Sequence, residues 1–329
     1  MALQQGTQLL HQIQSQPEEL HRLLTAPGTT AQIHTAAEGL HRVRRIWVVG
    51  TGSSQHAAAL GAAMLQDAGR SAHAVSSMQF VRNAPIVAPG DGVVIITHTG
   101  ETSYALSARA LAFGAGMQTF TVCRRGLPLN DIVETVEKEA SETYTSSYTA
   151  ALFVMARIAS AMGADTLTED ALAAVPEAVA AALTAPGVDA VPVPARALVV
   201  IGAGPASITA AEGSLKSREA ARVLTIGYDA EYFLHGSAVP LTAQDHLIAL
   251  YPPDDDGLVE ALARTAEGEG IGVTRLVEPA SLPTLLAQIP MTVRLQVLAA
   301  RFAQARGQDP DTVITGGWAE PSLWEIGGP

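Results

Sequence analysis

One segment near the start of the chain reads Arg45-Ile46-Trp47-Val48-Val49-Gly50-Thr51-Gly52-Ser53-Ser54. A short apolar run that closes on glycine and hydroxyl residues predicts a strand followed by a turn. The next residues, 54–68, have the alanine and leucine content of a helix. The segment therefore predicts a β-loop-α unit.

The same pattern recurs along the chain. In a first cycle we expect strands at 92–97 and 118–123 with a helix at 102–114 between them. A second cycle has strands at 197–202, 246–251 and 272–276 and helices at 206–223, 258–269 and 292–306. Alternating strands and helices imply parallel sheets covered by helices on both faces, which is an α/β fold.

The length of 329 residues exceeds that of a single usual core, so two lobes are expected. Residues 150–184 are rich in Ala, Leu, Val and Met and read as helices. Residues 185–196 carry three prolines, which cannot continue a helix. We predict a helical lead-in at 1–44, a first domain at 45–184, a linker at 185–196 and a second domain at 197–329.

Composition narrows the classes of function. No apolar run reaches the length of a membrane span, and residues 1–24 do not resemble a signal peptide, so a cytoplasmic protein without a membrane partner is expected. A net charge of −12 with only two lysines argues against a nucleic-acid partner. The single Cys123 cannot form an internal disulfide and is expected to be buried in a strand.

Two polar turns follow predicted strands and open predicted helices. The first contains Gly52, Ser53 and Ser54, and the second reads Thr97-His98-Thr99-Gly100-Glu101-Thr102. Glycine lets the backbone approach a ligand, hydroxyls donate, and a helix N-terminus favours anions. Because the net charge would repel an anion at long range, such local donors suit a phosphate better than a lysine cluster.

Other readings of these turns remain open. A dinucleotide site needs a third glycine and an acidic residue about 20 positions on, which the sequence lacks, and a Walker motif is absent. The first turn could be a plain tight turn. The second could serve to cap a helix through Thr99 or Thr102.

The two turns together resemble the sugar isomerase (SIS) family, whose members hold a substrate phosphate with such loops. The resemblance implies two tandem SIS domains, each a flavodoxin-like three-layer sandwich. It also implies phosphate contacts from matched positions, which are Ser53, Ser54, Thr97, His98, Thr99 and Thr102, with Gly52 as a weaker contact. His98 stands where glucosamine-6-phosphate synthase, a member of this family, has Gln; a neutral His still donates one hydrogen bond.

The second lobe carries the residues that point to proton transfer. The run Glu212-Gly213-Ser214-Leu215-Lys216-Ser217-Arg218-Glu219 is similar to the synthase's catalytic helix, and the distance to His235 also matches. The resemblance implies that Glu219 shuttles a proton, that His235 helps to open the sugar ring, and that Lys216 and Glu212 lie near the substrate. From spacing alone, Glu212, Lys216 and Glu219 share one helix face, which could also be a solvated surface stripe.

Two departures from the synthase bear on the reaction. The chain goes almost directly from Met1 into the sugar-binding lobes, so we expect no glutaminase domain, and the tail at 309–318 has no lysine for an imine. What survives is acid-base chemistry on an amino-sugar or ketosamine phosphate: isomerisation, deamination or deglycation.

Two alternatives to such an enzyme remain. One is a non-catalytic sugar-phosphate sensor, and the other is an aminotransferase-like protein that uses free ammonia. No cofactor and no metal is expected. The family resemblance also implies a homodimer in which His235 acts across the interface.

Overall fold

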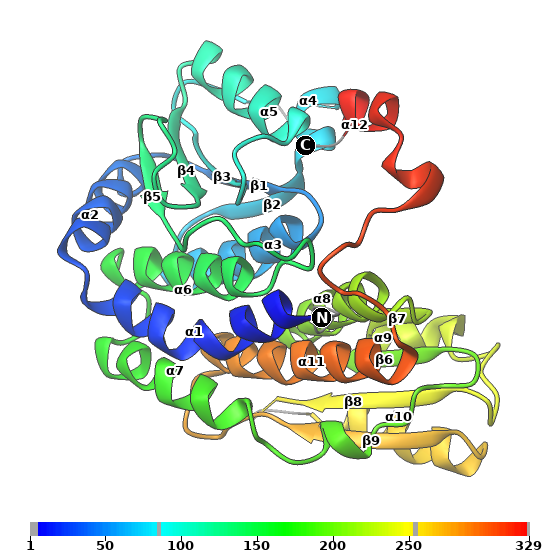
Figure 1. The fold of residues 1–329 in the computed structure, drawn as a ribbon. Coiled ribbons are helices and arrows are strands. Elements are labelled where there is room, and N and C mark those ends of the chain that lie inside the picture. Colours follow the sequence, from blue (N-terminus) through cyan, green and yellow to red (C-terminus); the bar gives the residue numbers. More distant parts are fainter. Residues whose placement is uncertain (1–5, 84–86, 253–255, 328–329) are drawn as a thin grey trace. The chain divides into compact units, whose positions relative to one another are not determined.

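The computed structural model describes residues 6–83, 87–252 and 256–327, and Figure 1 shows its elements. The strands are β1 (Ile46–Gly50), β2 (Ala72–Ser76), β3 (Gly92–Ile96), β4 (Gln118–Cys123), β5 (Ile132–Glu134), β6 (Leu198–Gly202), β7 (Thr225–Asp229), β8 (His246–Tyr251) and β9 (Gly272–Val277). The longer helices are α1 (Thr7–Thr25), α2 (Pro27–His41), α3 (Ser53–Asp67), α5 (Ser103–Gly114), α6 (Ser146–Ala161), α7 (Glu169–Ala182), α8 (Pro205–Ala221), α10 (Leu258–Gly268) and α11 (Thr284–Arg306). The short helices are α4 (Ser77–Arg82), α9 (Ala230–Tyr232) and α12 (Pro321–Gly327), with a π-turn at Phe233–Ser237 and 3-10 turns at Val188–Ala190 and Gly316–Ala319.

Contacts divide the chain into two compact units. One unit contains Gln16–Glu139, Ser146–Ala174 and Ile314–Pro329, and we call it the β1–β5 unit. The other contains Met1–Ser15, Ala140–Thr145 and Val175–Val313, and we call it the β6–β9 unit. The division falls inside α1 and α7 as well as between elements, so several chain crossings connect the units. The division into a lead-in at 1–44, domains at 45–184 and 197–329 and a linker at 185–196 remains a prediction. Residues 1 and 329 lie outside the described residues.

The β1–β5 unit is built on a five-stranded sheet in the order β2-β1-β3-β4-β5, and all its strand pairs are parallel. Helices α2, α3 and α6 cover one face and α4 and α5 the other, as Figure 1 shows. Strand β3 is buried along its whole length, as expected for an inner parallel strand. The order 2-1-3-4-5 is that of flavodoxin-like sheets.

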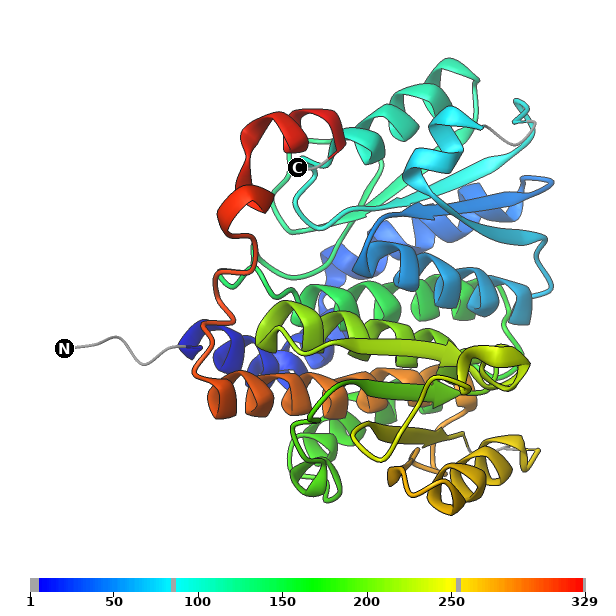
Figure 2. The same cartoon turned by 90° about the vertical axis from the view of Figure 1, so that its right-hand side faces the viewer.

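The β6–β9 unit repeats this plan with four strands. Its order is β7-β6-β8-β9, and every pair is again parallel. Helices α8 and α11 pack on one face and α10 on the other, as can be followed in Figure 2. Two apolar clusters, one around Leu198, Val200 and Phe302 and one around Val199 and Ile201, fill the space on either side of the sheet.

Most predicted elements are present, and some differ. The closing helix, predicted at 292–306, begins at Thr284 and carries Pro290 inside it, although proline interrupts the backbone hydrogen bonds of a helix. Strands β2, β5 and β7 were not predicted from the sequence. The prediction for Cys123 is confirmed, because it ends β4 with 1% exposure and burial raises the pKa of its thiol to about 12.

A membrane-crossing helix would need a long apolar segment. In the parts of the chain that the structure describes, none of the helices has one.

Candidate functional site

The ends of β1 and β3 lie side by side in the five-stranded sheet. Strand β1 pairs with β2 on one side and with β3 on the other, so the chain order reverses between β1 and β3. Open parallel sheets bind ligands at this reversal, beyond the carboxyl ends of the strands. Both polar turns found in the sequence follow these two strands.

The turn after β1 depends on its glycines. A Cβ on Gly50 would lie 2.2 Å from the main-chain oxygen of Ser54, so only glycine fits there. Gly52 precedes the first residue of α3 with φ of 56°, a conformation that glycine adopts without strain. Ser53 and Ser54 form the first turn of this 15-residue helix and are half-buried. Their hydroxyls therefore lie at the positive end of the helix dipole.

The turn after β3 presents hydroxyls that secondary structure does not use. Thr97 is 4% exposed, and its buried Oγ1 has no hydrogen-bond partner. The Thr99 Oγ1 accepts a hydrogen bond from the Glu101 N–H at 3.2 Å, which leaves the Thr99 O–H free to donate. Thr102 precedes α5 and makes no side-chain capping bond. The alternative that Thr99 or Thr102 caps α5 is therefore wrong.

His98 is held by the segment that leads into α6. Its Nε2 accepts a hydrogen bond from the main-chain N–H of Glu139 at 3.1 Å. Burial lowers the pKa of His98, an effect that the Glu139 carboxylate opposes and that Arg124 and Lys138 reinforce. A neutral ring that accepts at Nε2 carries its proton on Nδ1.

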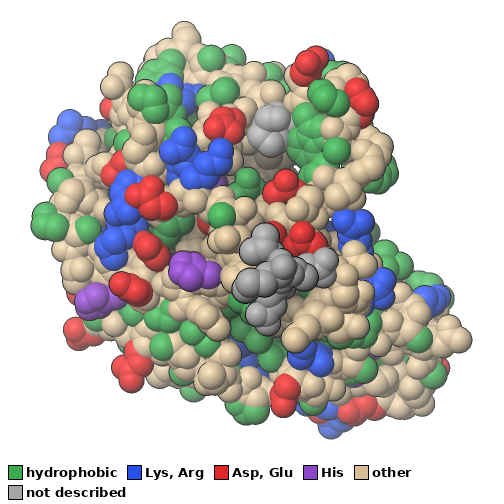
Figure 3. Space-filling model, in the orientation of Figure 1, with side chains coloured by type: hydrophobic (Ala, Val, Ile, Leu, Met, Phe, Trp, Pro, Cys, Tyr) green, Lys and Arg blue, Asp and Glu red, His purple; other side chains and the backbone are tan. Residues whose placement is uncertain are grey.

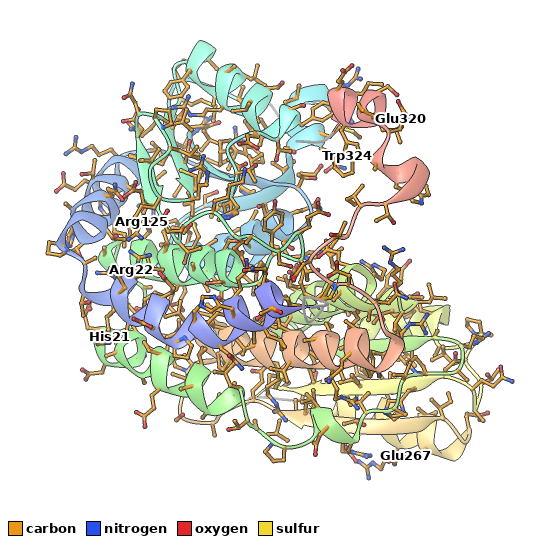
Figure 4. All side chains as sticks on the ribbon, viewed as in Figure 1. His21, Arg22, Arg125, Glu267, Glu320 and Trp324 are labelled. Atoms are coloured by element: carbon orange, nitrogen blue, oxygen red, sulfur yellow. The ribbon has the colours of Figure 1, made fainter. Side chains whose placement is uncertain are left out.

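Several basic side chains of the β1–β5 unit already have carboxylate or carbonyl partners. Lys138 pairs with Glu101 at 3.8 Å, and Arg125 with Glu137, at 2.7 Å from the Arg125 Nε. Arg22, labelled with Arg125 in Figure 4, donates to the carbonyl oxygen of Thr135 at 2.6 Å. On the face that Figure 3 shows, the Lys and Arg side chains are interspersed with Asp and Glu rather than gathered in one basic patch. An anion at the turns would thus depend on hydroxyls and N–H groups.

The second set of predicted residues lies on α8. Lys216 is 1% exposed, and its Nζ lies 2.5 Å from Glu219 Oε2 and 3.6 Å from Glu212 Oε1. The Glu212 side chain is fully buried, whereas that of Glu219 is 24% exposed. The alternative of a solvated surface stripe is therefore wrong, since these charges pair with each other inside the unit.

Burial raises the pKa of the Glu219 carboxyl. Lys216 opposes this effect by its charge and its hydrogen bond, while Glu212 adds to it. A carboxyl group of raised pKa beside a cation has the property that a proton shuttle needs, because it gains and loses a proton nearer to neutral pH.

His235 lies in the π-turn that follows α9. Its backbone departs from helical geometry at φ −80° and ψ 44°, and Gly236 follows with φ of 109°. The side chain of His235 is exposed, and so are those of Tyr232, Leu234 and Val239.

The structure thus gathers the predicted residues in two groups. Gly52, the two serines, His98 and the three threonines lie in the β1–β5 unit, and Glu212, Lys216, Glu219 and His235 lie in the β6–β9 unit. Glu139 was not predicted from the sequence; it precedes Ser146 and Ser147 at the start of α6, and its carboxylate accepts from their N–H groups at 3.2 and 2.8 Å. No motif marks it, because its link to His98 spans 41 positions.

The fold and these turns define an α/β protein of parallel sheets, with two hydroxyl-bearing turns at the carboxyl ends of neighbouring strands. A model of the SIS domain matches residues 39–156, which include β1, β3 and both turns. Residues 39–156 therefore carry a SIS domain, and the chain is homologous to part of the isomerizing glutamine–fructose-6-phosphate aminotransferases.

Curated relatives support this homology along the chain. A glutamine–fructose-6-phosphate aminotransferase (isomerizing) of Caulobacter vibrioides is 25% identical over 91% of this chain and 56% of its own. That of Thermococcus kodakarensis is 27% identical over 92% of this chain and 56% of its own. The chain therefore spans just over half the length of these relatives.

Solved structures share the fold. A tagatose-6-phosphate ketose/aldose isomerase from Escherichia coli has a TM-score of 0.80 at 17% identity and covers 95% of this chain and 97% of its own. A glucosamine-6-phosphate deaminase from Thermotoga maritima has a TM-score of 0.76 at 17% identity, and the match covers 93% of this chain and 97% of the deaminase. The C-terminal domain of glucosamine-fructose-6-phosphate aminotransferase from Francisella tularensis has a TM-score of 0.77 at 18% identity, and the match covers 93% of this chain and 98% of that domain.

Proposed function

We propose that this protein is an enzyme that binds a phosphorylated amino sugar or ketosamine and moves protons on it. One observation carries the proposal: two hydroxyl-bearing turns follow neighbouring strands where the sheet order reverses, and the buried Thr97 Oγ1 there has no partner. A phosphate has acceptor oxygens for such donors. The names of the relatives, which include an isomerase, a deaminase and aminotransferases, support a sugar phosphate as the ligand.

We propose that Ser53, Ser54, Thr97, Thr99 and Thr102 donate to the phosphate. His98 adds an N–H, and Gly52 lets the backbone approach the anion. Such a site needs no lysine cluster, in accord with the net charge of −12.

In the β6–β9 unit, Glu219 takes a proton from the carbon next to the carbonyl of the open-chain sugar and returns it to the neighbouring carbon. Lys216, held at 2.5 Å from Glu219 Oε2, stabilises the charged form of this carboxylate, and Glu212 fixes Lys216 from the other side. His235 acts as the acid and base that opens the ring. The product is an isomerised sugar phosphate or, where water hydrolyses the C–N bond, a sugar phosphate together with the released ammonia (deamination) or amine (deglycation).

We further propose a homodimer in which His235 serves the partner's site. The support is its place on an exposed turn beside the exposed apolar side chains of Tyr232, Leu234 and Val239. Large exposed apolar side chains that lie together are typical of interfaces.

Replacing Glu219 tests the function. Glu219→Gln keeps the shape of the side chain and removes the base, so turnover of glucosamine 6-phosphate or a fructosamine 6-phosphate should fall about 10²- to 10⁴-fold. Binding of the same compound, measured by calorimetry, should change little. Glu269→Gln, an exposed glutamate after α10, is the matched control.

Three outcomes would contradict parts of the proposal. Full turnover in Glu219→Gln would remove the assigned base. Binding of phosphosugars without turnover by the unaltered protein, over a panel of amino-sugar and ketosamine phosphates, would identify a sensor. A mixture of Glu219→Gln and His235→Ala proteins that stays inactive would exclude the action of His235 across a dimer.

A further inference from the structure

Two segments far apart in the sequence meet at His98. The His98 Nε2 accepts from the Glu139 N–H at 3.1 Å, and the His98 carbonyl oxygen accepts from the Arg124 N–H at 3.0 Å. The ion pair of Lys138 and Glu101 joins the same two segments at 3.8 Å. The turn after β3 is thus tied at several points to the chain that leads out of β4 and into α6.

The carboxylate of Glu139 is engaged in a second role. Its two oxygens accept the N–H groups of Ser146 and Ser147, at the start of the 16-residue helix α6. Unpaired N–H groups at a helix start attract an acceptor, and a carboxylate is especially suited to them. Because Glu139 is only 8% exposed, its main chain is fixed in place, and the N–H that faces His98 is fixed with it.

We propose that Glu139 is a positioning residue for the phosphate site: its N–H holds His98 in the tautomer with the proton on Nδ1, and this neutral ring is the form that binds the phosphosugar. The inference rests on the proposed function, since it assumes that the turn after β3 holds a phosphate. The inference goes beyond the proposed function because it assigns to Glu139 the positioning of His98, a role that no motif indicates.

Protonation of His98 should break this arrangement. An imidazolium carries N–H on both nitrogens, so Nε2–H would face the N–H of Glu139, and neither could accept from the other. The charged groups around the ring are Glu139, Arg124 and Lys138; burial, Arg124 and Lys138 lower its pKa, and this outweighs the opposing effect of the Glu139 carboxylate. The ring is therefore neutral at neutral pH and loses its acceptor as the pH falls through the lowered pKa.

The test compares the pH dependence of binding in three proteins. Sorbitol 6-phosphate is the probe, because it has the phosphate but no carbonyl on which to react. Its dissociation constant is measured by calorimetry between about pH 7.5 and about pH 5 for the unaltered protein, His98→Gln and His98→Leu. Gln supplies an acceptor oxygen and a donor NH₂ without titrating, whereas Leu supplies neither.

As the pH falls and the ring becomes protonated, the unaltered protein should lose affinity relative to His98→Gln, by up to about tenfold, the equivalent of one buried hydrogen bond. Taking this ratio cancels the titration of the probe's own phosphate. At the upper end of the range, His98→Leu should bind about tenfold more weakly than the unaltered protein, and His98→Gln should recover most of that loss. Circular dichroism verifies that each variant is folded, and if His98→Leu is not, the ratio with His98→Gln still decides.

A ratio that is flat with pH would overturn the inference, and so would one that rises on acidification, since the ring would then act as a cation on the phosphate. Either result leaves the proposed function intact. Failure of all three proteins to bind at any pH would instead contradict the proposed function itself.

Discussion

Lys216 is buried between two carboxylates on α8, with one negative charge left over in the group of three. Its Nζ lies nearer to Glu219 than to Glu212, at 2.5 Å against 3.6 Å. A buried cation stabilises the charged form of an adjacent carboxylate, so Lys216 limits how far burial raises the pKa of Glu219. The residue thus sets the pH range in which the proposed base is charged.

Replacing Lys216 should therefore move the pH profile of the enzyme. In the unaltered protein the acid limb of kcat/KM should lie above 4.5, the ordinary pKa of glutamate, because burial raises the pKa of Glu219. Lys216→Met should shift the limb further upward, and Lys216→Arg, which keeps the charge, should shift it less. An acid limb that does not move in Lys216→Met would show that Glu219 is not the titrating group.

At this scale the sequence predicted types and spacings but not environments. The intervals between Glu212, Lys216 and Glu219 predicted a shared helix face, which the two ion pairs confirm. Whether that face was buried or solvated depended on α11, which packs against α8 although it lies much further along the chain. The role of Glu139 likewise depends on a tertiary hydrogen bond that no local pattern reports.

At the scale of elements, α8 and α11 pack closely because Gly213 has no side chain. A Cβ at this position would lie 2.3 Å from Leu295 Cδ1 and 2.8 Å from Leu295 Cβ. Gly213 is buried in the middle of α8, where glycine otherwise costs helix stability. The close approach of the two helices explains why it stands there.

Gly213→Ala should destabilise the protein in spite of the better helix propensity of alanine. Overpacking costs about 1–3 kcal/mol, whereas alanine returns at most about 1 kcal/mol. Urea unfolding measures the difference, with Gly28→Ala as control, since Gly28 is exposed in α2 and a Cβ there would have no neighbour within 4 Å. In a protein that already carries Leu295→Ala, Gly213→Ala should cost less than in the unaltered protein, and an equal cost would exclude the clash as its cause.

The three strands that were not predicted from the sequence all lie at the edge of a sheet. β2, β5 and β7 are edge strands, whereas the inner strands β1, β3, β4, β6 and β8 were all predicted, as was one edge strand, β9. An inner parallel strand is buried on both faces and reads as a continuous apolar run. Strand β2 has two exposed side chains, and β7 contains Gly227, whose Cβ would lie 2.5 Å from the backbone of Ala210.

At the scale of the whole molecule, the two sheets repeat one design in detail. Gly52 and Gly204 precede α3 and α8 with nearly the same backbone angles, φ 56° and ψ −132° against φ 52° and ψ −128°. Gly50 and Gly202 end β1 and β6, and at both a Cβ would strike the following helix. The turn after β6 lacks the row of hydroxyls found after β1, so only the β1–β5 unit carries the proposed phosphate site.

The repetition extends to a buried aspartate just before the third strand of each sheet. Asp91 precedes β3 and accepts from Arg45 at 2.6 Å, and Asp245 precedes β8 and accepts from Arg196 at 2.8 Å. Burial raises the pKa of Asp91, but hydrogen bonds from Arg45, Arg44 and Trp47 outweigh it and lower the pKa overall. The hydrogen bonds of Arg196 lower the pKa of Asp245.

Each aspartate should therefore stabilise its own unit in a way that depends on pH. A carboxyl whose pKa is lowered by folding contributes its stability above the unfolded pKa of about 3.9, and loses it as the pH falls toward the folded value. Asp91→Asn and Asp245→Asn should each lower the free energy of unfolding by about 1–3 kcal/mol near neutral pH. The difference from the unaltered protein should shrink below about pH 4.

Urea unfolding at several pH values measures this for both variants, with Glu177→Gln on the exposed side of α7 as control. The control should change stability by less than about 0.5 kcal/mol at any pH. If the loss in either aspartate variant were the same at acid and neutral pH, the hydrogen bonds would not depend on the charge of the aspartate. If only one of the two variants lost stability, the two Arg–Asp pairs would not contribute equally to the free energy of unfolding in spite of their similar geometry. The two sheets would then be stabilised by different interactions.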